Sequence, residues 1–184
     1  PITGRLCAMA RIRPVSGFTL IELILALALV AILVAVALPS YQSLRQEQMV
    51  RAATQAIYTD VMLLKSEAVK RNSNLTLIIF NSGLSGWCYR VAVDGAGTCN
   101  SCADSCSSVE GRKGGDASEY PGLTLTASYT GGKLTFSPRR GTLAAGNIEL
   151  SSDTYNLRVV SNNVGRVSTC APTGSKVGGV PSCS

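Results

Sequence analysis

Residues 17–22 read Gly-Phe-Thr-Leu-Ile-Glu, and they open an apolar run that continues to Leu38. Only Thr19 and Glu22 interrupt this run, which reaches the length of roughly 20 residues that a helix needs to cross a membrane. A carboxylate inside a membrane helix is costly and usually serves a function. The stretch therefore predicts a membrane-length helix with one functional acidic residue near its start.

A short basic segment precedes this helix. Residues 1–17 contain Arg5, Arg11 and Arg13 and no acidic residue. Positively charged flanks stay in the cytoplasm, so the part of the chain after Leu38 is expected on the other side of the membrane. A cleaved secretory signal ending near 35–37 (Ala-Val-Ala) and an ordinary uncleaved anchor are alternatives, although the apolar run exceeds the usual signal core of about 7–15 residues.

The helix is expected to continue past the apolar run, through Pro39. Apolar residues recur at steps of three and four, which is typical of an amphipathic helix. They are Tyr41, Leu44, Ala53, Ala56, Ile57, Val61, Leu64 and Ala68. We expect one helix from about Phe18 to about Arg71, with a membrane part (18–38), an amphipathic part (39–72) and a stop at 72–74 (Asn-Ser-Asn).

The remainder contains short runs of β-forming residues, separated by Gly, Asn, Pro and Ser. These runs are 75–80, 87–93, 122–130, 133–136, 147–150, 156–161 and 165–170. The pair Gly131-Gly132 predicts a hairpin between its two neighbouring runs. The expected fold is α+β: a long helix packed on an antiparallel sheet of about five to seven strands. This β domain covers 73–170, with an irregular Cys-rich loop at 94–119 and a tail at 171–184.

The junction at Gly17-Phe18, with Glu22 four residues further on, resembles the processing site of the type IV pilin and pseudopilin family. The resemblance implies that a prepilin peptidase removes residues 1–17 and methylates the new N-terminal Phe18. It implies that Glu22 pairs with a terminal amine during filament assembly. It also implies a single-pass inner-membrane protein with a periplasmic C-terminal domain, or a surface filament if the chain belongs to a pilus, and partnership with other pilins or pseudopilins.

Further segments resemble the GspH/FimT group of minor pilins and pseudopilins. They are 65–72, Gly86-Trp87, 136–141, 157–161 and 165–167. The group implies a subunit of a type IV pilus or of a type II secretion system, and the sequence leaves the choice between the two open. The group also includes a minor pilin that binds DNA during natural transformation.

DNA uptake is the alternative function, with double-stranded DNA as a further partner. Binding to phosphates requires Lys and Arg rather than base-reading groups. The candidate contacts are Arg139, Arg140, Arg158, Arg166 and Lys176. The DNA-binding members share a Gly-Arg-x-Arg motif, which Gly165-Arg166 begins here, but Ser168 replaces the second Arg. Cationic side chains on strands are also ordinary solvated positions at a sheet edge.

Six cysteines remain after Cys7 leaves with the leader. They are Cys88, Cys99, Cys102, Cys106, Cys170 and Cys183. An even number in an exported domain favours disulfides over the alternative of a zinc or iron–sulfur site. The family resemblance implies that Cys170 and Cys183 close the C-terminal tail, while the other pairings stay open. We therefore expect no metal and no cofactor.

An enzyme is the third and weakest hypothesis. The chain has no His, which excludes Ser-His-Asp and Cys-His catalysis and any His-containing metal site. Two carboxylates could pair for acid–base work, for instance Glu110 with Asp116 or Asp104, but they lie in a polar loop without the apolar surroundings that would raise a pKa. No catalytic residue is therefore assigned, and a membrane-anchored periplasmic enzyme is disfavoured.

Overall fold

The computed structural model describes residues 17–93, 99–104, 106 and 114–183. The chain divides into two compact units at Tyr41–Gln42, and residues 42–184 are called the head below. Helix α1 (Leu20–Arg71) contributes to both units. The predicted single helix is confirmed, and it passes through Pro39.

Within the head, one stripe of α1 is buried. Its members recur every three or four residues and are at most 1% exposed: Val50, Ala53, Ile57, Val61, Leu64 and Ala68. This spacing places them on one side of a helix, where their burial removes apolar surface from water. Tyr41 and Leu44 were expected in the same stripe, but they are 66% and 56% exposed, so the buried stripe begins only at Val50.

The end of α1 has the features that the sequence predicts. Asn72 adopts the left-handed conformation, with φ of 47°, and the Ser73 amide donates to the Ala68 carbonyl at 3.2 Å. This is the usual way to satisfy the last carbonyls of a helix. Glu67, only 6% exposed, accepts a bond from Lys70 at 2.6 Å and forms an ion pair with Arg71 at 3.5 Å.

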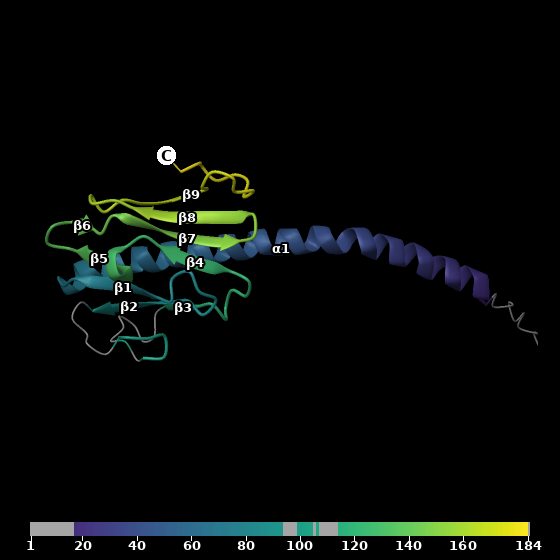
Figure 1. Ribbon diagram of the computed structural model, residues 1–184, viewed down its shortest axis with the longest axis horizontal. Helices are drawn as coiled ribbons and strands as arrows, with labels where there is room; N and C mark the ends of the chain where they lie inside the picture. The colour runs from purple at the N-terminus through teal and green to yellow at the C-terminus, as the bar shows by residue number, and fades with distance from the viewer. Residues whose placement is uncertain (1–16, 94–98, 105, 107–113, 184) are drawn as a thin grey trace, which may run out of the picture. The chain divides into compact units, whose positions relative to one another are not determined.

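The strands form two antiparallel sheets rather than the single sheet that was expected (Figure 1). The first sheet has the order β3-β2-β1-β5-β6. Its strands are β1 (Leu75–Phe80), β2 (Cys88–Val93), β3 (Gly114–Asp116), β5 (Lys133–Ser137) and β6 (Thr142–Leu143). The second sheet has the order β4-β7-β8-β9. Its strands are β4 (Thr124–Ala127), β7 (Gly146–Ser152), β8 (Tyr155–Ser161) and β9 (Val167–Cys170).

The predicted hairpin at Gly131-Gly132 is wrong. The strands on either side belong to different sheets, and the short helix η1 (Thr130–Gly132) carries the chain between them. Both glycines have positive φ, and a Cβ on Gly132 would lie 2.6 Å from the Ile79 carbonyl oxygen. Gly132 is therefore required by a close backbone approach to β1 and Gly131 by its positive φ alone, which a sequence pattern cannot distinguish from a two-residue turn.

The predicted irregular loop at 94–119 is wrong at Gly114–Asp116, which forms the edge strand β3 and pairs with β2. Part of the loop lies outside the described residues. The tail from Ala171 is also held in place: Ala171 bridges to Ser182, and Arg51 of α1 donates to the carbonyl of Gly178.

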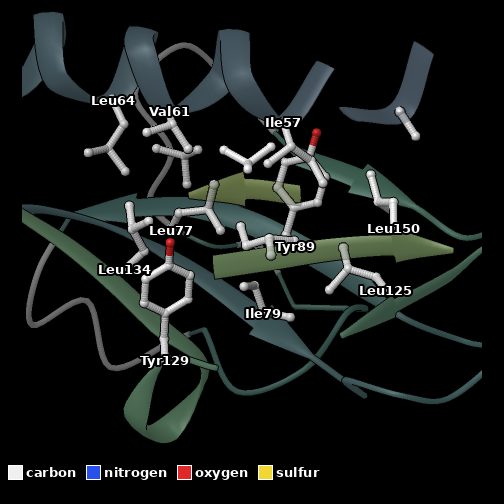
Figure 2. Close-up of a cluster of buried hydrophobic side chains, with 14 of the residues drawn as sticks. Ile57, Val61, Leu64, Leu77, Ile79, Tyr89, Leu125, Tyr129, Leu134 and Leu150 are labelled. Atoms are coloured by element: carbon white, nitrogen blue, oxygen red, sulfur yellow. The ribbon is translucent and has the colours of Figure 1, made fainter. Parts of the chain in front are cut away.

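The core of the head joins α1 to residues of both sheets. Figure 2 shows Leu77 and Leu134 of the first sheet, and Leu125 and Leu150 of the second, in one cluster with the α1 stripe. The Tyr89 hydroxyl of β2 donates to Asp60 of α1 at 2.9 Å, and burial raises the pKa of this phenol. One continuous core therefore joins the head part of α1 to strands of both sheets.

Trp87, the single tryptophan, provides a test of this packing because it is buried and donates from Nε1 to the Leu123 carbonyl at 2.7 Å. Leu64→Ala should lower the free energy of unfolding by about 2–5 kcal/mol, because it leaves a cavity between α1 and the sheets. Urea unfolding of residues 18–184 in a non-ionic detergent, followed by Trp87 fluorescence, measures this change in the free energy of unfolding. The control Met62→Ala, on the exposed side of α1, should change it by about 0.5 kcal/mol or less. Equal effects of the two substitutions would contradict the packing.

The ion pairs at the end of α1 predict a pH dependence. The hydrogen bond from Lys70, with the charge of Lys70 and the contacts of Arg71, lowers the pKa of Glu67 below its ordinary value of 4.5. A lowered pKa in the folded state stabilises the protein above the unfolded value, and this contribution is lost as the pH falls through the folded value. Glu67→Gln should therefore lower the urea midpoint at pH 7, and the difference from wild type should vanish well below pH 4.5. A difference that persists at low pH would rule out this electrostatic origin.

Candidate functional site

The first candidate site is the start of α1. Thr19 caps the helix: its Oγ1 accepts a bond from the Glu22 amide at 3.3 Å, and its carbonyl accepts one from the Leu23 amide at 3.2 Å. Phe18, the predicted first residue after cleavage, is 84% exposed. The chain therefore presents residues 17–22 as an accessible segment at a helix start.

An apolar surface follows this segment. The large apolar side chains from Leu20 to Leu38 are all exposed, at 47% or more. By length and composition α1 could cross a membrane. Glu22 is the only charged residue in this stretch, and no described residue forms an ion pair or hydrogen bond with its carboxylate. Within the described part of the chain, neither the apolar surface nor the carboxylate has a partner.

The second candidate site is one end of the head. Arg139 and Arg140 lie in the turn between β5 and β6, and Arg166 lies in the turn between β8 and β9. The two turns are in contact, since a Cβ on Gly165 would lie 2.9 Å from the carbonyl oxygen of Gly141. All three arginine side chains are exposed. Three of the five predicted DNA contacts are therefore brought together.

Lys65 of α1 joins these arginines, which the sequence reasoning missed. Its Nζ donates to the Gly165 carbonyl at 2.7 Å and lies 5.9 Å from the centre of the Phe136 ring. A Lys on a helix is usually only a solvated charge, so nothing in the local pattern indicates this contact. We define the basic end of the head as Lys65, Arg139, Arg140 and Arg166.

The other two predicted contacts lie elsewhere. Arg158, on β8, forms an ion pair with Glu149 of the neighbouring strand at 2.6 Å. Lys176 lies in the tail. Its backbone amide donates to the carbonyl of Thr154, which lies in the turn between β7 and β8, whereas Arg166 lies in the turn at the other end of β8. Neither residue belongs to the basic end, so the predicted set of five is not one surface.

The six cysteines of the head form three disulfides. Cys170–Cys183 has the pairing that the family resemblance implies, and the other two are Cys88–Cys102 and Cys99–Cys106. A sulfur in a disulfide is not available as a thiolate ligand. Among the described residues there is no group of three side chains that could hold a metal ion.

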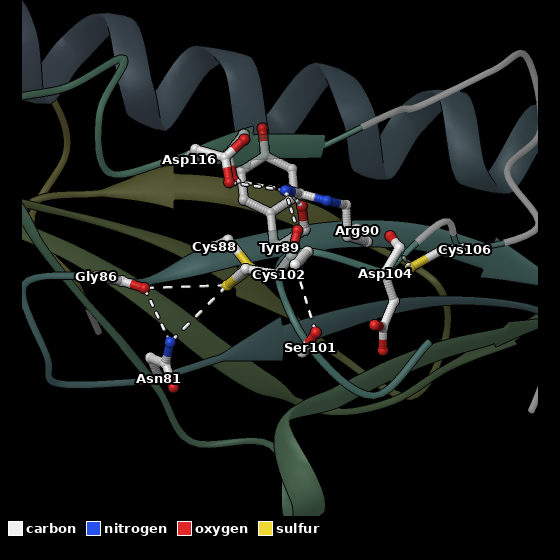
Figure 3. A network of polar contacts seen from close by, with 12 residues as sticks. Asn81, Gly86, Cys88, Tyr89, Arg90, Ser101, Cys102, Asp104, Cys106 and Asp116 are labelled. Atoms are coloured by element: carbon white, nitrogen blue, oxygen red, sulfur yellow. Dashed lines mark hydrogen bonds and ion pairs between the residues drawn. A yellow bond between two sulfur atoms is a disulfide. The ribbon is translucent and has the colours of Figure 1, made fainter. Parts of the chain in front are cut away.

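A buried arginine organises the disulfide-linked segment, and sequence reasoning did not find it. Arg90 of β2 is 1% exposed and pairs with Asp116 of β3 at 2.7 Å (Figure 3). Its guanidinium also donates to the carbonyls of Tyr89, Gly115 and Cys102, at 2.8, 3.2 and 2.9 Å. The two terminal nitrogens are thus bonded, while the buried Nε has no hydrogen-bond partner among the described residues. The terminal nitrogens tie β3 and the disulfide at Cys102 to β2.

The carboxylates of the enzyme hypothesis do not form a catalytic pair among the described residues. Asp116 is bound to Arg90, and hydrogen bonds led by the Asn100 amide lower the pKa of Asp104. Glu110 lies outside the described residues. An acid catalyst needs a raised pKa, so the Asp104 carboxyl is not suited to donate a proton at neutral pH.

Two family models match this chain. The chain matches the family described as Type II transport protein GspH over residues 53–165, and the prokaryotic N-terminal methylation motif over residues 12–38. No curated protein matches the chain.

Two crystal structures of the type IV minor pilin FimU from Pseudomonas aeruginosa strain PAO1 are similar to this structure. In space group P65 the identity is 15% and the TM-score 0.46, covering 65% of this chain and 90% of that chain. In space group P21 the identity is 16% and the TM-score 0.49, covering 65% and 86%.

The GspH match spans more than half of the chain, and the methylation motif covers the Gly17-Phe18 junction. The predicted membership of the GspH/FimT group is therefore confirmed: this chain belongs to the GspH family of type IV pilins and pseudopilins.

Proposed function

We propose that this protein is a minor subunit that assembles into a type IV pilus or a type II secretion filament. Before assembly its helix spans the inner membrane and its head lies in the periplasm. The observation that carries this proposal is Glu22, a carboxylate within the exposed apolar surface of α1 that has no ion-pair or hydrogen-bond partner among the described residues.

The physical argument concerns what could cover this surface. Lipid covers exposed Leu, Ile and Val side chains well, but it leaves a carboxylate without a partner. Cleavage after Gly17 would create a positively charged amine on Phe18, and the same amine on a neighbouring subunit offers Glu22 an opposite charge. Packing among apolar helices therefore satisfies the surface and the carboxylate together, and the carboxylate sets the register of one helix against the next.

Glu22→Ala tests this role. The variant should be cleaved and membrane-bound like the wild type, but it should be lost from sheared filaments or from the purified assembly, because its helix has no partner for the neighbouring amine. Immunoblots of membrane and filament fractions measure both steps. Gly17→Leu serves as the control, because this variant should not be cleaved after residue 17 and should accumulate in the membrane fraction as the precursor. Normal incorporation of Glu22→Ala would refute the assembly role of Glu22.

We propose DNA binding as a second function, because the basic end of the head is a specific feature that assembly does not need. Lys65, Arg139, Arg140 and Arg166 gather from α1 and two separate turns, and the one buried carboxylate at the adjacent helix end, Glu67, is engaged by Lys70 and Arg71. Cations without carboxylate partners attract a phosphate backbone.

The DNA proposal predicts a strong dependence on salt. Affinity of the mature protein in non-ionic detergent for duplex DNA should fall steeply between two salt concentrations, and the log–log slope should decrease by about 0.9 for each phosphate contact removed. Arg139→Ala with Arg140→Ala should weaken binding to all sequences alike. Arg158→Ala, which removes an arginine paired with Glu149, should have little effect. An absence of binding at low salt would remove this function and leave the assembly role intact.

A further inference from the structure

A polar hollow lies within the head and shares Arg139 and Arg140 with the basic end. It has a volume of about 540 Å³. Its lining residues all carry a side chain that can donate a hydrogen bond: Asn72, Ser73, Asn74, Ser137, Arg139 and Arg140. No carboxylate lines it. A hollow with six donor side chains and two positive charges is complementary to an anion.

The walls of the hollow are fixed by the sheet register. Leu75 of β1 is paired with Phe136 of β5, so the segment 72–74 that precedes β1 lies beside the segment 137–140 that follows Phe136. Asn72 holds the chain reversal at the helix end in the left-handed conformation, with φ of 47°. The Thr76–Thr135 side-chain hydrogen bond, at 2.8 Å, ties the same two strands together one residue further in. Only Ser137 of the lining lies in a strand, but the pairing of β1 with β5 holds the two lining segments beside each other.

The two arginines lack a counter-charge within the described part of the chain. No ion pair or hydrogen bond joins the side chain of Arg139 or Arg140 to a described residue. Glu67, at the end of α1, is already held by Lys70 and Arg71. Adjacent guanidinium groups repel each other, and an anion bound between them would relieve that repulsion. The planar guanidinium fork matches the oxygens of a phosphate.

We propose that this hollow is a binding site for one phosphate group. Arg139 and Arg140 supply the positive charge. The side-chain amide of Asn74 and the hydroxyl of Ser137 supply neutral hydrogen-bond donors that select an oxygen-rich anion over chloride. The group could be free phosphate or a phosphodiester of nucleic acid, which share this chemistry. The inference rests on the second proposed function only for the phosphodiester, because binding of free phosphate is measured separately.

The test uses the mature protein in a non-ionic detergent without phosphate. Inorganic phosphate is titrated at constant ionic strength against sodium chloride, and the backbone amide NMR signals of residues 72–74 and 137–140 are followed. We expect saturable shifts confined to these residues. Arg139→Ala with Arg140→Ala should abolish them, and Asn74→Ala with Ser137→Ala should weaken binding about tenfold without changing the charge.

A charge-matched control distinguishes a site from general attraction. Arg158→Ala with Lys176→Ala removes two positive charges outside the hollow and should leave phosphate affinity unchanged. Equal weakening by the two charge-removing pairs, or an absence of saturable shifts in the wild type, would overturn the inference, and unchanged signal dispersion elsewhere shows that the variants are folded.

A short DNA duplex provides the second arm of the test. If the duplex displaces phosphate from the hollow, the site holds a phosphodiester. If phosphate binds and the duplex does not, the hollow is a site for free phosphate and the DNA proposal alone fails. If the duplex binds but phosphate gives no saturable shift, this inference fails and the DNA contact is a diffuse one.

Discussion

The exposed apolar surface of α1 between Leu20 and Leu38 is the constraint on which the biology of this chain depends. Exposed patches of this size on a protein mark an interface with lipid or with another protein. Lipid tails and neighbouring helices both cover the apolar part, but lipid tails offer Glu22 no charged partner. In the proposed filament a neighbouring subunit supplies that partner, so the proposal accounts for the apolar surface and the carboxylate together.

The head differs from this exposed part of α1, because its apolar side chains are buried in a core of its own. The stripe from Val50 to Ala68 fills one side of a core that both sheets share. Segments outside that core are held by disulfides. One disulfide closes the tail, and two hold the segment around Arg90. Closing such loops restricts the unfolded chain, which stabilises segments with little apolar surface of their own. The head can thus carry irregular surface segments without a larger core.

The sequence predicted the features that local patterns control. The single helix, its stop after Arg71 and the positions of most strands follow from periodicity and from breaker residues, and the junction at Gly17-Phe18 indicates the family. Features that depend on long-range pairing were not predictable. The glycines at 131–132 fit a hairpin as well as a crossing between sheets, and only the contact with Ile79 decides between them. Arg90 looked like an ordinary strand residue, since its partners are carbonyls distant in sequence.

The basic end illustrates why charge must be counted after folding. Grouped by their position in the chain, five cations form one predicted DNA-binding surface. In the structure Arg158 is paired with Glu149 and Lys176 lies in the tail, so neither belongs to the basic end. The register between β1 and β5 instead places the helix end against the arginines of the next turn. Lys70 and Arg71 both contact Glu67, which offsets one of their two positive charges, and the turn between β5 and β6 supplies the arginines that line the hollow. Turn residues can change without disturbing a core, so in this architecture the charge at the end of the head can vary independently of the fold that presents it.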